Sequence, residues 1–107
     1  MTKETIVLEK FYQKGEKDSP VYILSHCRVG KHQTEYTLLR RVSAIFTGSD
    51  YRIGVERAVR DSFKREIKSE TYDPKEIEGK IYELVLKAAQ DYAQMHDWTI
   101  DDKVRGK

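Results

Sequence analysis

The sequence contains a single cysteine, Cys27, so an internal disulfide is excluded. No apolar run approaches the roughly 18 residues that a membrane-spanning helix needs. The first residues lead directly into a strand-like segment, so we expect no signal peptide and no contact with a membrane. Together these absences favour a small soluble protein of a reducing, cytoplasmic compartment.

Apolar and charged residues are almost equally frequent, at 38% and 36% of the 107 residues, and the net charge is only +2. The apolar residues recur periodically and the net charge is low, which excludes a disordered chain. A chain of this length can bury one core without metals or disulfides. We therefore expect a single domain over residues 1–107, with flexible ends at 1–4 and 101–107.

The small net charge conceals an uneven distribution. Residues 26–68 hold ten Lys and Arg against five acids, a net charge of +5. Residues 69–107 hold six against nine, a net charge of −3. Such a division places opposite potentials on different parts of the surface. The basic middle of the chain is therefore the first place to look for a binding surface.

Two segments near the N-terminus are predicted strands. Thr5–Gln13 is rich in β-branched and aromatic residues, and Val21–Val29 follows after a polar turn. Residues 34–46 fit either a helical stripe or a strand, in which Arg40 would interrupt an apolar face. The short glycine-containing connection before residues 34–46 favours a third strand that forms a hairpin with the second.

Two later segments are predicted helices. The first covers residues 49–68, with Val55, Val59 and Phe63 spaced at intervals of four along one side. The second covers residues 73–97 and begins with an Asp-Pro pair, which suits an N-cap and a first helical position. A glutamate three residues after the aspartate completes a capping-box spacing.

These elements predict an α+β fold, in which a three-stranded antiparallel meander is followed by two helices packed on one face. The alternative is a β-hairpin with three helices, if residues 34–46 are helical. The two arrangements differ in how much of the sheet stays uncovered, and the surface hypotheses below depend on the first.

No residues are arranged for catalysis, and we expect neither a metal nor a cofactor. His26 and Cys27 are neighbours in a predicted strand and point to opposite faces, so they cannot act as base and nucleophile. Cys27 is interpreted as a buried structural thiol. No second cysteine supports a zinc site, and the segment 29–32 lacks the residues of a phosphate loop. The sequence favours a binding protein over an enzyme.

Nucleic-acid binding is the first functional hypothesis. On a helical wheel of residues 49–68, four cations fall on one side, away from the apolar residues. Such a stripe can contact successive phosphates of DNA or RNA, although a solvated helix face is also normally charged. On the uncovered sheet face, aromatic residues and cations suit the stacking of bases. The predicted nucleic-acid-binding residues are Arg57, Arg60, Lys64 and Lys68 on the helix, with Arg28, Lys31, Arg41, Tyr22 and His26 from the sheet.

The alternative hypothesis is a protein-interaction or dimeric regulatory module that does not bind nucleic acid. Two helices cannot cover both faces of one sheet, so an apolar patch would remain on the outer face. Leu24, Leu39 and Ile45 are the residues expected in this patch. A homodimer or another protein would cover them.

Overall fold

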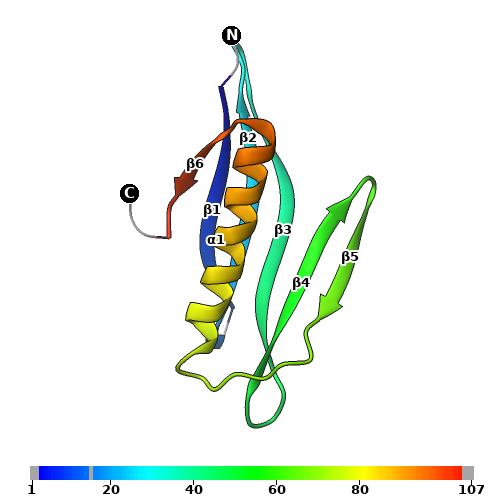
Figure 1. Ribbon diagram of the computed structural model, residues 1–107, viewed down its shortest axis with the longest axis vertical. Coiled ribbons are helices and arrows are strands. Elements are labelled where there is room, and N and C mark those ends of the chain that lie inside the picture. Colours follow the sequence, from blue (N-terminus) through cyan, green and yellow to red (C-terminus); the bar gives the residue numbers. More distant parts are fainter. Residues whose placement is uncertain (1–2, 15, 105–107) are drawn as a thin grey trace.

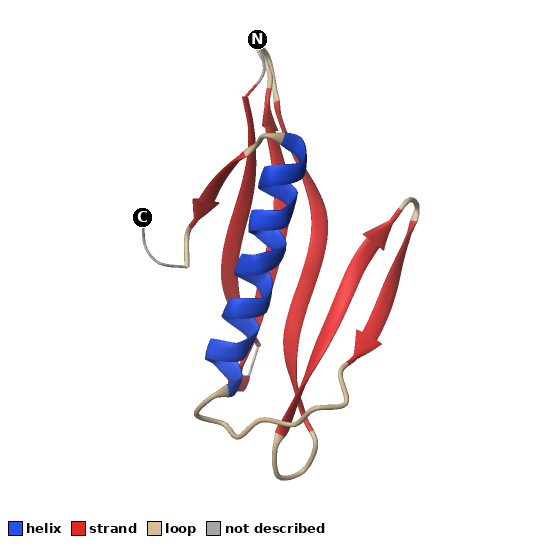
Figure 2. Cartoon of the chain, viewed as in Figure 1, coloured by secondary structure: helices blue, strands red, loops and turns tan. Residues whose placement is uncertain are grey.

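The structure is a computed structural model and describes residues 3–14 and 16–104. Within these residues the chain forms strands and one helix, and strands predominate (Figure 2). The elements in chain order are β1 (Lys3–Gln13), β2 (Glu16–Val29), β3 (Thr34–Phe46), β4 (Tyr51–Val59), β5 (Ser62–Ile67), α1 (Ile77–His96) and β6 (Thr99–Asp102).

The six strands form one sheet in the order β5-β4-β3-β2-β1-β6. Neighbouring strands are antiparallel from β1 to β5, whereas β6 is parallel to β1. α1 packs against β1 to β4 and β6 on one side, called here the covered face (Figure 1). No other described element packs on the opposite side, called the open face. The β4–β5 hairpin leans away from α1 (Figure 1).

The hydrophobic core lies between α1 and the covered face. Strand alternation in β1 directs Ile6 and Leu8 toward α1, and both are fully buried. Leu24 of β2 pairs with Leu8 and is equally buried. From the helix, Ile81 meets this layer because apolar residues recur along one side of α1. The body of the protein, defined as β1 to β3 with α1, therefore holds most of the buried apolar surface.

The predicted capping hydrogen bonds at Asp73 are present, but α1 begins at Ile77, four residues later than predicted. The Asp73 carboxylate accepts hydrogen bonds from the backbone N–H groups of Lys75 and Glu76, at 2.9 and 3.0 Å. In return, the Glu76 carboxylate accepts from the Asp73 N–H at 3.2 Å. This reciprocal pair is a capping box. The helix ends at His96, and Asp97 adopts a left-handed conformation with φ of 58°.

The predicted helix over residues 49–68 is wrong, because these residues form the β4–β5 hairpin. An interval of four places residues on one side of a strand as well as on one side of a helix, so the spacing of Val55 and Val59 does not distinguish the two. Phe63 follows the turn and lies on the opposite face, beside Ala58. The turn gives no glycine signal either. It is formed around Arg60, which has φ of 55°, a conformation uncommon outside glycine.

Both predicted architectures are therefore wrong: the fold is a six-stranded mixed sheet with one helix. The predicted strand over residues 34–46 is confirmed as β3, and the protein remains in the α+β class. Residues 101 and 102, expected to be a flexible end, belong to β6. Residues 1, 2 and 105–107 of the predicted flexible ends lie outside the described part. No helix in the described part is long and apolar enough to cross a membrane.

Candidate nucleic-acid interface

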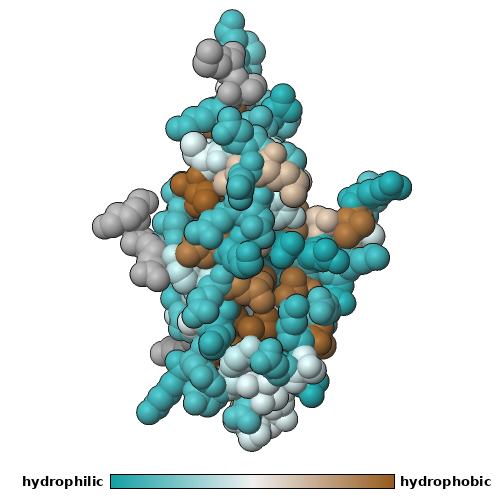
Figure 3. Space-filling view, in the orientation of Figure 1, coloured by the Kyte–Doolittle hydropathy of each residue, from teal (hydrophilic) through white to brown (hydrophobic). Residues whose placement is uncertain are grey.

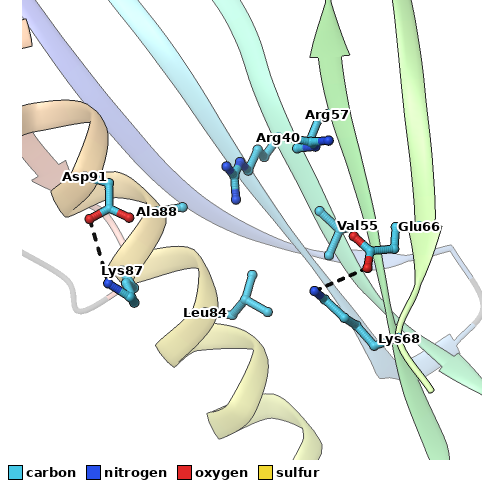
Figure 4. A pocket seen from close by; sticks show the side chains of 9 residues that line it. All are labelled: Arg40, Val55, Arg57, Glu66, Lys68, Leu84, Lys87, Ala88 and Asp91. Atoms are coloured by element: carbon cyan, nitrogen blue, oxygen red, sulfur yellow. Dashed lines mark ion pairs between the residues drawn. The ribbon is translucent and has the colours of Figure 1, made fainter. Parts of the chain in front are cut away.

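A groove of about 380 Å³ lies on the covered face, between α1 and the hairpin. Apolar side chains are visible between the helix and the hairpin, with hydrophilic ones around them (Figure 3). Most of the polar lining is charged and comes from both walls (Figure 4). The lining residues are Arg40, Val55, Arg57, Glu66, Lys68, Leu84, Lys87, Ala88 and Asp91.

Three cations form a row across the strands at this groove. Arg40 of β3 pairs with Arg57 of β4, and Arg57 pairs with Lys64 of β5. Directly paired residues project on the same face, and like charges in this position destabilise a sheet. Among the described residues, none of the three forms an ion pair with an acid. The row, called here the basic row, therefore presents positive charge that the protein itself does not neutralise.

Arg40 is the innermost member of the basic row. Its guanidinium carbon lies 5.7 Å from the centre of the Tyr92 ring on α1, a cation–π arrangement. Its Nε is buried and finds no hydrogen-bond acceptor within the part of the chain that the structure describes. A buried donor without an acceptor costs about 1–3 kcal/mol.

Two acids reduce the charge at the rim of the groove. Glu66 lies 3.5 Å from the Lys68 amine, and Asp91 lies 3.8 Å from the Lys87 amine. Both are surface pairs, which contribute about 0–1 kcal/mol and are screened by salt. Adding Lys64 to the lining gives five cations and two acids, a net charge of +3. The lysines can therefore exchange these weak partners for a polyanion.

Three of the four cations predicted on the helical stripe do lie together. Arg57 and Lys64 are a cross-strand pair, and Lys68 lines the same groove just beyond the end of β5. The prediction grouped these residues on one side of a helix. In the structure Arg57 and Lys64 lie on the same face of two paired antiparallel strands instead. Arg60 does not line the groove and forms the hairpin turn instead.

The cations predicted from the sheet lie elsewhere. Arg28 lines a separate hollow of about 200 Å³ beside the β2–β3 turn, which contains Lys31. Arg41 projects on the open face, where its guanidinium donates to the Glu56 carboxylate at 2.7 Å. The structure thus does not bring these three residues to the basic row.

Tyr22 and His26 are not part of an exposed stacking surface, because β2 turns both toward the covered face. Tyr22 is fully buried, its hydroxyl donates to Glu78 at 3.4 Å, and burial raises its pKa to about 12. The His26 ring stacks on Trp98 with centroids 3.9 Å apart, and its Nε2 lies 3.0 Å from a Glu4 oxygen. The expectation of an aromatic binding face on this side of β2 is corrected, since α1 and the segment after it cover these rings.

The residues predicted for protein binding are divided between the two faces. Leu24 is fully buried in the core beneath α1, and Leu39 packs against that core beside a register irregularity between β2 and β3. Ile45 alone lies on the open face, where its side chain leans over Gly54. Alternation within β2 was read correctly, but the wrong face of β2 was expected to be covered. The pairing of Leu24 with Arg40 and the register shift beside Leu39 separate the three residues.

Sequence reasoning missed Arg40 and Lys87 as members of the groove. The signal for Arg40 was its position within an otherwise apolar strand face, which is unusual for a cation. Lys87 gave no signal, because it is one of several charged residues on the exposed side of α1. Only the position of the hairpin relative to α1 brings the two together.

The described residues hold no cluster of His, Cys, Asp or Glu suited to a metal ion. Cys27 is a free thiol and is buried, as predicted, with His26 on the opposite face. No protein-family model, curated protein sequence or solved structure matches this chain.

Proposed function

We propose that the protein binds single-stranded nucleic acid, with the phosphate backbone in the groove between α1 and the hairpin. The basic row carries this proposal, because Arg40, Arg57 and Lys64 stand side by side without an acidic partner among the described residues. Successive phosphates would neutralise the three cations and release counterions.

The size of the groove favours a single strand over a duplex. Its volume of about 380 Å³ is near the lower end of pockets that hold a small molecule, so it suits one or two nucleotides. A duplex is too wide to enter a groove of this volume and would contact only its rim, without reaching Arg40. Arg40 at the inner end would add its positive charge to the binding of a phosphate.

Fluorescence anisotropy of labelled single-stranded DNA, single-stranded RNA and duplex DNA tests the proposal. Binding to the single strands should weaken steeply between roughly 50 and 200 mM salt. Arg57→Glu and Lys64→Glu should each lower affinity at least ~10-fold on every sequence and flatten the salt slope by about one or more. Both side chains are exposed, so the variants should fold normally.

The matched control is Lys103→Glu, which makes the same change of charge just after β6, at the opposite edge of the sheet. Its affinity should stay within about twofold of the wild type, because exposed charges beyond a Debye length of roughly 10 Å are screened. Equal losses in all three variants would mean that binding follows net charge rather than the groove. Absence of binding at low salt would refute the proposal outright.

A further inference from the structure

The open face of the sheet carries several large apolar side chains that are exposed to solvent. Most of the large apolar side chains that are strongly exposed lie on it, and Tyr36 and Phe63 are 64% and 60% exposed. On the same face, Val7 of β1 and Val21 of β2 are buried by neighbouring side chains although no described element covers them. Exposed apolar patches of this kind usually mark an interaction surface. The exposed members are Phe11, Val29, Tyr36, Phe63 and Ile67.

The pairing of the strands places these residues in rows that cross the sheet. One row runs from Phe11 on β1 to Ile67 on β5 and is apolar at both ends. The next runs from Glu9 on β1 to Arg65 on β5 and is acidic at one end and basic at the other. Asp101 of β6 lies beside β1 and adds to the acidic end.

We propose that this open face packs against the same face of a second copy, about a twofold axis that runs along β3. Such an axis places β1 of one copy over β5 of the other. Phe11 then meets Ile67 of the partner subunit, and Glu9 meets Arg65 of the partner subunit. A twofold axis perpendicular to the strands would instead stack Glu9 on Glu9 and Arg65 on Arg65. Charge complementarity therefore selects the axis along the strands.

The centre of the face is compatible with burial. The Arg41 guanidinium and the Glu56 carboxylate already form an ion pair at 2.7 Å, so neither charge would enter the interface alone. The two longer dimensions of the molecule, 50 and 31 Å, give a face large enough for the roughly 800 Å² per partner of a stable interface. The groove lies on the covered face, so the dimer leaves it open and does not depend on the proposed nucleic-acid binding.

Sedimentation velocity of the full chain over a range of concentrations tests the dimer. The wild type should sediment as a dimer at micromolar concentration. Glu9→Arg and Arg65→Glu should each raise the dimer dissociation constant at least ~10-fold, because each places like charges in contact twice. The double variant Glu9→Arg/Arg65→Glu exchanges the signs and should recover most of the affinity. Its recovery also shows that the single variants were folded.

The control is Arg57→Glu, which should lose nucleic-acid binding and keep the dimer mass. A wild type that is monomeric at every concentration overturns the dimer without affecting the groove. Failure of the double variant to recover overturns the proposed axis. If Arg65→Glu abolishes nucleic-acid binding by a monomeric wild type, the open face binds nucleic acid rather than a second copy.

Discussion

The body and the hairpin contribute very differently to the core. In the body, Leu8, Leu24 and Ile81 are wholly shielded from solvent, and α1 packs along three strands. In the hairpin, every residue of β5 is exposed, and α1 lies next to β4 but not next to β5. The hydrophobic effect therefore stabilises mainly the body. The hairpin is held by the backbone hydrogen bonds of β4 to β3 and by the buried side chains of Tyr51, Ile53 and Val55, all on β4, whereas β5 adds no buried side chain.

This division separates stability from binding. The basic row places like charges side by side, which costs stability, and two of its three members stand in the hairpin, where few buried contacts depend on them. Such weakly packed segments open locally more often than a core does. The same weak packing leaves the hairpin free to adjust around a ligand that neutralises its charge.

The largest effect is expected when one apolar side chain is truncated in each region, which compares how much packing stabilises the body and the hairpin. Leu24→Ala in the body should lower the free energy of unfolding by about 3–4 kcal/mol, because the site is fully buried beneath α1. Val59→Ala, at the half-buried end of β4, should cost about 1 kcal/mol or less. Urea unfolding measures both. Similar losses would show that the hairpin is packed as firmly as the body.

The second largest effect is expected at alkaline pH, which should lower the free energy of unfolding through groups in the body. Burial raises the pKa of Tyr22 to about 12, and a hydrogen bond to Glu78 raises the pKa of Lys10 above its usual 10.5. Raised pKa values stabilise the fold below pH 10, and this contribution is lost as the pH rises through the folded values. Tyr22→Phe should remove the part of this pH-dependent loss that comes from the ionisation of Tyr22, on the order of 1–2 kcal/mol of unfolding free energy between pH 9 and 12.

The alkaline unfolding midpoint, followed by circular dichroism, checks this prediction. Tyr72→Phe is the control, since Tyr72 is only half-buried and lies outside the Lys10 and Glu78 contacts. The Tyr22→Phe variant should unfold at higher pH than the control. An unchanged midpoint would mean that the ionisation of Tyr22 does not limit alkaline stability.

The smallest effect is expected at the hairpin turn. Arg60 has φ of 55°, which costs a non-glycine residue about 1 kcal/mol. Arg60→Gly should therefore raise the free energy of unfolding by up to ~1 kcal/mol. Arg60→Ala removes the same charge but keeps the strain, so it should give no gain. If both variants gain equally, charge repulsion rather than strain limits the turn.

The same comparison explains how much of the fold was predictable. In the body, β-branched residues, alternation and the capping box at Asp73 agree with the tertiary structure, and β1, β3 and α1 were found within four residues of their true bounds. β2 begins at Glu16, five residues earlier than predicted. In the hairpin, the turn at Arg60 lacks the usual Asn-Gly or Asp-Gly, and residue spacing suited a helix equally well. Strand β6 was missed because it is four residues long and depends on pairing with distant β1.

The candidate site was predictable only in part. Arg57, Lys64 and Lys68 were identified because intervals of seven and four residues group them on a helical wheel. In the structure the pairing of β4 with β5 brings Arg57 and Lys64 together instead. Tyr22 was assigned to the wrong environment because alternation defines two faces without saying which one a helix covers. Arg40 entered the site through pairing of β3 with β4, a contact between residues 17 positions apart in sequence. Such non-local pairing cannot be derived from local pattern.

Hydrogen–deuterium exchange of the full chain, with and without a single-stranded oligonucleotide at low salt, tests whether the loosely packed hairpin and α1 together bind the strand. We expect the free hairpin to exchange faster than the body, and the ligand to slow exchange in residues 57–68 and 84–91, on the two walls of the groove. Protection confined to the β2–β3 turn around residues 28–33, or no protection under conditions of saturating binding, would contradict this expectation.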